Sequence, residues 1–191
     1  MVTEIRIYFE GASELREGFR SFFGEIKTAD GRGPKLIAGG GREQAIADFR
    51  KSFKSHAAAL NLLLIDSEGP DTGRLFETIC QPQQIPENAR GKVFWMVECM
   101  ESWFLADVEA LGRYYYLDLA EALRGNPDVE EIPKRDVLAR LKAATNGRYH
   151  KTKDAPHLLK RILPERVKQA APNCRRLFNR FLSDSYRSPK L

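Results

Sequence analysis

The apolar run LLLI at residues 62–65, followed by DSEGP at residues 66–70, decides the fold class of this chain. A run in which apolar and polar side chains do not alternate predicts a strand that is covered on both faces, as strands inside parallel sheets are. The acidic segment behind it contains Gly and Pro and predicts a loop. We therefore expect a buried strand that opens into an acidic loop.

Three further strands and two helices are predicted around this run. The segments EIRIYF (4–9), KLIA (35–38) and VFWMV (93–97) read as strands. Between them, residues 15–26 and 46–60 carry apolar side chains at helical spacing. Strands that alternate with helices imply right-handed crossovers and a parallel sheet. The expected fold class is α/β, a Rossmann-like, mostly parallel four-strand sheet flanked by helices.

The strand signal ends near residue 101, and the rest of the chain is predicted to be helical. Helices are expected over residues 134–145, 156–163 and 173–184, separated by Pro156, Pro164 and Pro172. The loop around residues 125–127 (GNP) is expected to join the two parts of the chain. It divides the chain into an α/β domain, residues 1–125, and a basic helical C-terminal segment, residues 126–191, packed on that domain.

Several aromatic residues and the cysteines are expected to have structural roles. Trp103 and Phe104 are predicted to lie in the core, although aromatic rings there could also stack on a base. The run at residues 114–116 (YYY) is predicted to pack between the two parts of the chain. The three cysteines show no CxxC spacing, so we expect buried thiols rather than disulfides or a zinc site.

Composition and charge restrict the class of protein. Hydrophobic residues make up 42% of the chain and charged residues 30%, which is typical of a soluble globular protein. The most apolar stretch, residues 57–65, is shorter than the roughly 18 residues of a membrane span. The first ten residues lack the pattern of a signal peptide. We expect a cytoplasmic protein without a membrane partner.

The charge is unevenly distributed along the chain. Residues 134–191 hold 16 Lys and Arg against 4 Asp and Glu, whereas residues 1–133 hold 15 against 22, within an overall net charge of +5. A basic segment attracts the phosphate backbone of nucleic acid through counterion release, without reading bases. A solvated basic helical surface explains the same charges equally well, so charge alone leaves both interpretations open.

Acidic residues follow three of the four predicted strands. Glu10 follows the first strand, Asp66 and Glu68 the third, and Glu98 and Glu101 the fourth. The carboxyl ends of parallel strands meet at one edge of a sheet, where converging carboxylates repel one another unless a cation neutralises them. On an extended segment Asp66 and Glu68 point the same way, toward one ion. Oxygen ligands favour Mg²⁺ or Mn²⁺. The alternative is that Glu10 and Asp66 cap the following helices.

Two segments are candidate phosphate-binding sites. The residues Gly40, Gly41 and Arg42 open a predicted helix, where free N–H groups and the guanidinium can hold a phosphate; a plain tight turn explains them as well. The segment YHKTK at residues 149–153 concentrates hydrogen-bond donors. Its His150, Lys151 and Lys153 are candidates for binding phosphate or nucleic acid, with a solvated loop as the alternative.

The residues at the strand ends resemble the Toprim fold of topoisomerases, primases and small nucleases. The resemblance is carried by strand, Glu-Gly and helix at residues 7–11 and by the strand that ends in LIDSE at residues 64–68. In that superfamily a Glu after the first strand and an Asp-x-Asp after the third hold Mg²⁺ for phosphodiester chemistry. The resemblance implies that Glu10 is a general acid/base or metal ligand and that Asp66 and Glu68 are metal ligands. The longer Glu68 replaces the second Asp, and Glu101 is the candidate fourth acid.

More narrowly, the chain resembles the bacterial domain-of-unknown-function family 4276 (DUF4276), Toprim-like proteins often encoded beside an ATPase of the ATP-binding-cassette or AAA type. The motifs AGGGR (38–42), ECMESWFLAD (98–107), YHKTK (149–153) and APNC (171–174) carry this resemblance in order along nearly the whole chain. It implies an ATPase as partner protein.

These observations predict a metal-dependent nuclease, a hydrolase of phosphodiester bonds in DNA or RNA that works with the ATPase in defence against phage or plasmids. The alternative is a catalytically inactive Toprim-like subunit that regulates the ATPase complex or binds nucleic acid, which the Asp-x-Glu motif keeps open. A small-molecule phosphotransfer enzyme has less support, because the chain has neither a P-loop nor a dinucleotide fingerprint.

Overall fold

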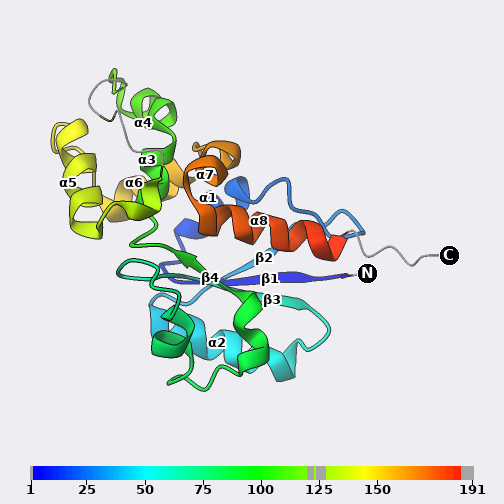
Figure 1. Ribbon diagram of the computed structural model, residues 1–191. Helices are drawn as coiled ribbons and strands as arrows, with labels where there is room; N and C mark the ends of the chain where they lie inside the picture. The colour runs from blue at the N-terminus through cyan, green and yellow to red at the C-terminus, as the bar shows by residue number, and fades with distance from the viewer. Residues whose placement is uncertain (1, 120–122, 124–127, 186–191) are drawn as a thin grey trace.

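A single parallel sheet forms the centre of the protein (Figure 1). The computed structural model describes residues 2–119, 123 and 128–185, so the expected boundary between residues 125 and 126 lies outside the described residues. The strand order is β2-β1-β3-β4, and every neighbouring pair is parallel. The predicted α/β class with four parallel strands is confirmed. The strands are β1 (Ile5–Phe9), β2 (Lys35–Ala38), β3 (Leu60–Asp66) and β4 (Val93–Met96).

The run that predicted the central strand is buried on both faces. All seven residues of β3 are buried, between β1 on one side and β4 on the other. Successive side chains of a strand point to opposite faces. Accordingly, Leu62 and Leu64 belong to one hydrophobic cluster, and Leu63 and Ile65 belong to a second cluster on the other face.

Helices cover both faces of the sheet. The face below the sheet in Figure 1 is covered by α2 (Arg42–Ser55) and by short helical turns at Phe76–Cys80 and Glu87–Lys92. The other face carries α1 and the helices of the C-terminal part, which share the larger hydrophobic cluster. These are α1 (Leu15–Phe22), α3 (Ser102–Ala106), α4 (Val108–Tyr115), a turn at Val129–Glu131, α5 (Lys134–Ala144), α6 (Lys151–Leu159), α7 (Pro164–Ala170) and α8 (Pro172–Ser185).

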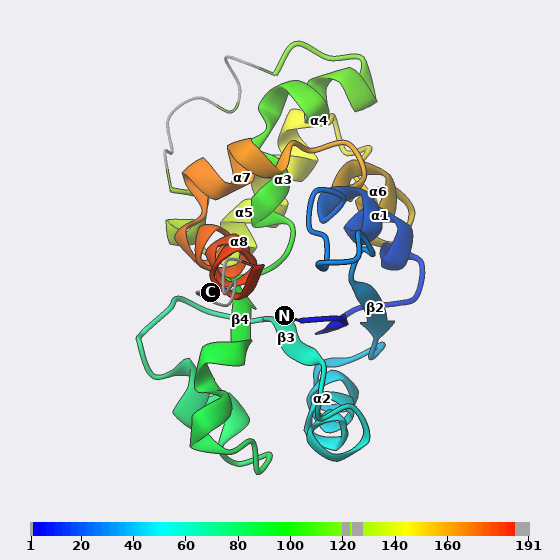
Figure 2. The ribbon, with the colours of Figure 1, turned by 90° about the vertical axis from the view of Figure 1, so that its right-hand side faces the viewer.

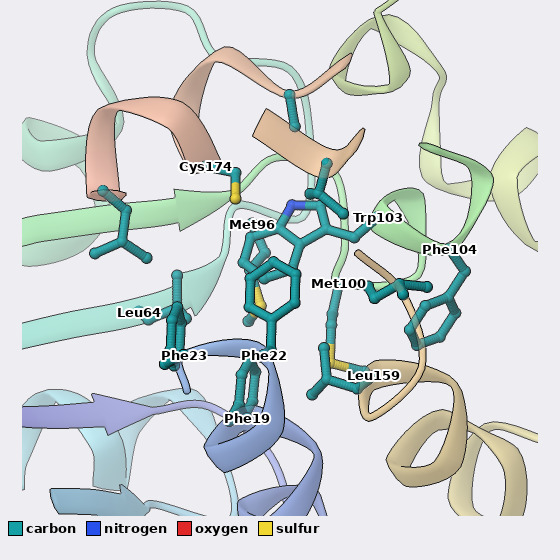
Figure 3. Close-up of a cluster of buried hydrophobic side chains, with 14 of the residues drawn as sticks. Phe19, Phe22, Phe23, Leu64, Met96, Met100, Trp103, Phe104, Leu159 and Cys174 are labelled. Atoms are coloured by element: carbon teal, nitrogen blue, oxygen red, sulfur yellow. The ribbon is translucent and has the colours of Figure 1, made fainter. Parts of the chain in front are cut away.

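Aromatic packing joins the C-terminal helices to the sheet layer (Figure 3). Phe22 of α1 stacks on Trp103 of α3 with ring centroids 5.1 Å apart and meets Phe178 of α8 edge-on at 5.7 Å. Trp103 and Phe104 are fully buried, so their predicted place in the core is confirmed. One continuous core therefore fixes the basic helices on the sheet.

The helices of the C-terminal part differ from the prediction in one region. The predicted helix over residues 156–163 is wrong: α6 begins at Lys151 and ends at Leu159, with Pro156 inside it, and α7 follows. The Asp154 carboxylate accepts a hydrogen bond from the His150 backbone N–H at 2.7 Å, which satisfies one donor at the start of α6. Pro164 and Pro172 are the first residues of α7 and α8, a position that tolerates proline.

Two further observations concern the cysteines and the hydropathy of the helices. Cys80, Cys99 and Cys174 are buried free thiols, as predicted. In the part of the chain that the structure describes, no helix has both the length and the hydropathy to cross a membrane.

Helices α1 and α6 lie side by side (Figure 2) and approach closely at Gly18. A Cβ added there would lie 2.9 Å from the Pro156 carbonyl oxygen and 3.0 Å from Leu159 Cβ. We expect Gly18→Ala to lower the free energy of unfolding. Overpacking typically costs about 1–3 kcal/mol, which exceeds the gain of about 1 kcal/mol in helix propensity. Urea denaturation measures the change. Gly91→Ala is the control because its added Cβ meets nothing within 4 Å; an equal loss in both variants would contradict the expectation.

Candidate functional site

Three carboxylates meet at the carboxyl ends of β1 and β3. Glu10 directly follows β1, Asp66 is the last residue of β3, and Glu68 lies two residues further on. One oxygen from each side chain lies within 4.8 Å of the other two. Asp66 is buried, Glu10 is half-buried and Glu68 is exposed, so the group opens toward solvent. We call Glu10, Asp66 and Glu68 the acidic triad.

Backbone hydrogen bonds hold the two inner acids. The Asp66 N–H donates to Glu10 Oε2 at 3.2 Å, and the Met100 N–H donates to Asp66 Oδ1 at 2.9 Å. Glu10 is itself fixed because its N–H donates to the Leu64 carbonyl at 3.0 Å. The backbone bonds of these carboxylates thus join the ends of β1 and β3 to each other and to the turn before α3, rather than capping the helices that directly follow Glu10 and Asp66.

Glu68 reaches the triad by a route that differs from the prediction. The extended segment ends at Asp66, and Glu68 has a left-handed backbone with φ 60°. That conformation is unfavourable for a residue with a Cβ and is often found at functional sites. The expectation that Asp66 and Glu68 share a direction on an extended segment is therefore wrong. A tight turn, rather than strand alternation, brings the two carboxylates together.

Basic side chains from two helices surround the triad. Arg42, the first residue of α2, places Nε 3.5 Å from Glu10 Oε2 and Nη2 3.7 Å from Glu68 Oε1. Lys134, the first residue of α5, pairs through Nζ with Glu68. The Lys134 N–H also donates to Glu98 Oε2 at 2.8 Å, so Glu98 holds the start of α5. Lys134 was not predicted, since it lies 66 residues from Glu68 and no local pattern links them.

Glu101 lies beside the triad but is not a member of it. Its side chain is fully buried, and its Oε1 accepts a hydrogen bond from the Tyr149 hydroxyl and pairs with Lys151 Nζ, both at 3.2 Å. Its Oε2 has no hydrogen-bond partner among the described residues. The sequence identified Glu101 and Lys151 separately; the fold joins them as an ion pair.

A cavity of about 340 Å³ opens over the inner acids. Of the candidate phosphate-binding residues, Gly40 and Lys151 line this cavity, and Arg42 contacts the triad at its edge. Gly41 and His150 are the residues that precede α2 and α6, and Lys153 is exposed on α6; none of these three lines the cavity. The lining residues are Glu10, Gly11, Ala12, Glu14, Leu15, Gly40, Asp66, Met100, Lys151, Thr152, Ala155 and Pro156.

The inner acids repel one another. Burial, together with the negative charges of Glu10 and Glu101, raises the pKa of Asp66 to about 7. Burial lowers the pKa of Lys151, but the carboxylates of Glu101 and Asp66 outweigh it and raise that pKa above its usual value. A carboxylate that resists ionisation gains most from a nearby cation. The all-oxygen triad is a donor set of the kind that Mg²⁺ and Mn²⁺ accept.

The raised pKa of Asp66 predicts how the stability of the metal-free protein depends on pH. An unfolded Asp titrates near pH 3.9, whereas Asp66 in the folded protein has a pKa of about 7. Between these values the folded state binds more protons, so its free energy of unfolding should fall as the pH rises from about 4 to about 7. Urea denaturation in chelator over this range measures the slope. Asp66→Asn should flatten it; an unchanged slope in the variant would assign the dependence to other groups.

The comparisons with known proteins identify a family. A family model described as "Domain of unknown function (DUF4276)" matches residues 13–182. The matched segment includes Asp66, Glu68, Glu101 and Lys151, and it begins three residues after Glu10. No curated protein and no solved structure matches the chain. Since the match covers most of the chain, the protein belongs to the DUF4276 family.

Proposed function

We propose that this protein is a metal-dependent phosphodiesterase, a nuclease acting on DNA or RNA. One observation carries the proposal: the acidic triad, with one oxygen of each acid within 4.8 Å of the others, lies among the basic side chains of Arg42, Lys134 and Lys151. Metal-dependent phosphodiester hydrolysis uses both kinds of group, because carboxylates hold a divalent ion and cations bind phosphate oxygens.

The roles of the residues follow from their places in the site. Glu10, Asp66 and Glu68 would hold Mg²⁺ or Mn²⁺, which supplies Lewis acidity and lowers the pKa of bound water. Arg42 presents a planar guanidinium, which suits a phosphate, next to Glu10 and Glu68. Glu10 lines the cavity and is only half-buried, so its carboxylate can also take a proton from water.

The charge of the C-terminal helices supports a polymeric substrate. These helices share one core with the face of the sheet that carries α1, and α6 contributes Lys151 to the cavity. Further exposed basic side chains lie on α6, in the turn that follows it and on α8, and they supply the counterion-releasing contacts that nucleic-acid backbones require. They are Lys153, Lys160, Arg161, Arg175 and Arg176.

The ATPase partner is part of the proposal as well. Because the resemblance described above implies an ATPase partner, we propose that the nuclease works beside an ATPase in defence against phage or plasmid DNA. Cleavage by the purified chain should then change when the ATPase and ATP are added, and an unchanged rate and substrate range would argue against the partnership.

The test of the proposed function is direct. Purified protein is incubated with labelled duplex DNA, single-stranded DNA or tRNA in Mg²⁺, Mn²⁺ or chelator, and products are resolved on a denaturing gel. We expect products only with metal. Their absence with every polymer and metal, alone and with the ATPase, would overturn the proposal.

A second candidate, a catalytically inactive regulatory or nucleic-acid-binding subunit, is favoured by one observation. Lys134 and Arg42 already neutralise Glu68 without any metal, and Arg42 also pairs with Glu10, so two acids of the triad have cation partners within the protein itself. This candidate predicts nucleic-acid or ATPase binding that persists in chelator, with no cleavage. Metal-dependent strand scission would rule it out.

A further inference from the structure

Lys151 neutralises the one acid of the site that lies outside the triad. Its Nζ is 3.2 Å from Glu101 Oε1, and Glu101 has 0% exposure. The other charged groups recorded around the site pair with the triad: Arg42 with Glu10 and Glu68, and Lys134 with Glu68. The four acids therefore fall into two sets: the triad, whose oxygens lie within 4.8 Å of one another, and Glu101, which lies outside that group and is paired with Lys151.

A buried carboxylate needs a positive partner. An unpaired charge in the interior is strongly unfavourable, and the Tyr149 hydroxyl that donates to Glu101 at 3.2 Å is neutral. In two-metal phosphodiesterases a second ion supplies the positive charge beside the first. Here the Lys151 ammonium lies next to Glu101, and Lys151 lines the same cavity as Glu10 and Asp66.

The fold holds this lysine in position. Lys151 is the first residue of α6, and the buried Asp154 carboxylate fixes the start of that helix by accepting the His150 N–H at 2.7 Å. The hydroxyls of Tyr114 and Tyr115 hold the same carboxylate, each at 2.9 Å. Lys151 therefore extends from an anchored helix start and lines the cavity, whereas Lys153, two residues on, does not line it.

We propose that the site binds a single divalent ion, at Glu10, Asp66 and Glu68, and that the Lys151 ammonium supplies at Glu101 the positive charge that a second ion would otherwise supply. The inference rests on the proposed function for the presence of the metal, but not for the identity of the substrate. It makes Lys151 a positioning residue and predicts how many ions the site takes.

The test counts Mn²⁺ ions bound to the full chain by calorimetric titration and by the loss of the free-Mn²⁺ electron paramagnetic resonance signal. We expect one ion per chain in the unaltered protein, and two or none would overturn the inference. In Lys151→Met, Glu101 loses its cation, so we expect a second Mn²⁺ to bind. A folded Lys151→Met protein that binds one ion would overturn the role of Lys151. Lys153→Met is the matched control and should bind one.

A double variant covers the case in which Lys151→Met unfolds. Lys151→Met combined with Glu101→Gln removes both charges, so it should recover thermal stability lost by the single variant and bind one ion. Failure to recover would overturn the pairing. Metal counting and cleavage also separate the two proposals: one ion without cleavage would overturn only the nuclease, and two ions with cleavage would overturn only the inference.

Discussion

Asp66→Asn is expected to reduce metal-dependent cleavage by about 10²–10³-fold, the usual effect of removing one group that stabilises charge at a reacting centre. The amide keeps the shape of the side chain and an oxygen that can accept the Met100 N–H, now bonded to Asp66 Oδ1 at 2.9 Å. It removes the negative charge that the buried position tolerates poorly, as the pKa of about 7 shows. Activity should therefore fall while the fold persists.

Initial rates on the preferred polymer, measured in Mg²⁺ and Mn²⁺, give the size of this effect. Glu10→Gln should cause a loss of the same order, because Glu10 and Asp66 belong to one group. Asp48→Asn is the matched control: this carboxylate contacts Gln44 and Lys51 on the surface of α2 and lies outside the triad. If Asp66→Asn and Glu10→Gln both cleave at the unaltered rate, the triad is not the catalytic site.

Asp154→Ala is expected to lower the free energy of unfolding by about 3 kcal/mol or more. The Asp154 side chain is 4% exposed and accepts hydrogen bonds from the Tyr114 hydroxyl, the Tyr115 hydroxyl and the His150 N–H. Removing it leaves the buried Tyr115 hydroxyl and two partly buried donors without their acceptor. A buried unsatisfied donor costs about 1–3 kcal/mol, and donors that water can reach cost less. The carboxylate also lies near the start of α6, where negative charge is favourable.

Urea denaturation at neutral pH measures this loss. Tyr115→Phe removes a single donor and should cost about 1 kcal/mol. Glu165→Ala is the surface control, because this exposed acid pairs, among the residues that the structure describes, only with Lys168 of α7, and such pairs contribute about 0–1 kcal/mol. A loss in Asp154→Ala no larger than that in Glu165→Ala would show that the hydrogen bonds to Asp154 do not hold α6.

The strands and the order in which they follow one another along the chain could be predicted from the sequence, because the patterns that indicate strands are local. Residues 35–38 form β2 within the predicted bounds, and the other three strands differ from prediction by one or two residues at their ends. Burial of β3 on both faces followed from a run without polar interruption.

The helices of the C-terminal part were harder to predict because contacts distant in the chain decide where they begin. Pro156 suggested that a helix begins there, but α6 begins at Lys151, where the Asp154 carboxylate accepts the His150 N–H. The tyrosine run shows the same dependence: Tyr114 and Tyr115 bond to Asp154 as packing residues, whereas Tyr116 is 93% exposed, so the prediction that it packs is wrong. Tyr116 ends α4 in a left-handed conformation, which turns it outward.

The sequence by itself determined that the protein has a parallel sheet with acids at the carboxyl ends of its strands. The strand pattern and the acids that directly follow each strand are local features of the sequence. Parallel topology then brings those strand ends to one edge of the sheet. Only the tertiary structure decided which partner each acid meets. Lys134 reaches Glu68 across 66 residues, and Tyr149 reaches Glu101 across 48. Ion pairs and hydrogen bonds act over a few ångströms, so these partners exist only once the C-terminal helices have packed against the sheet.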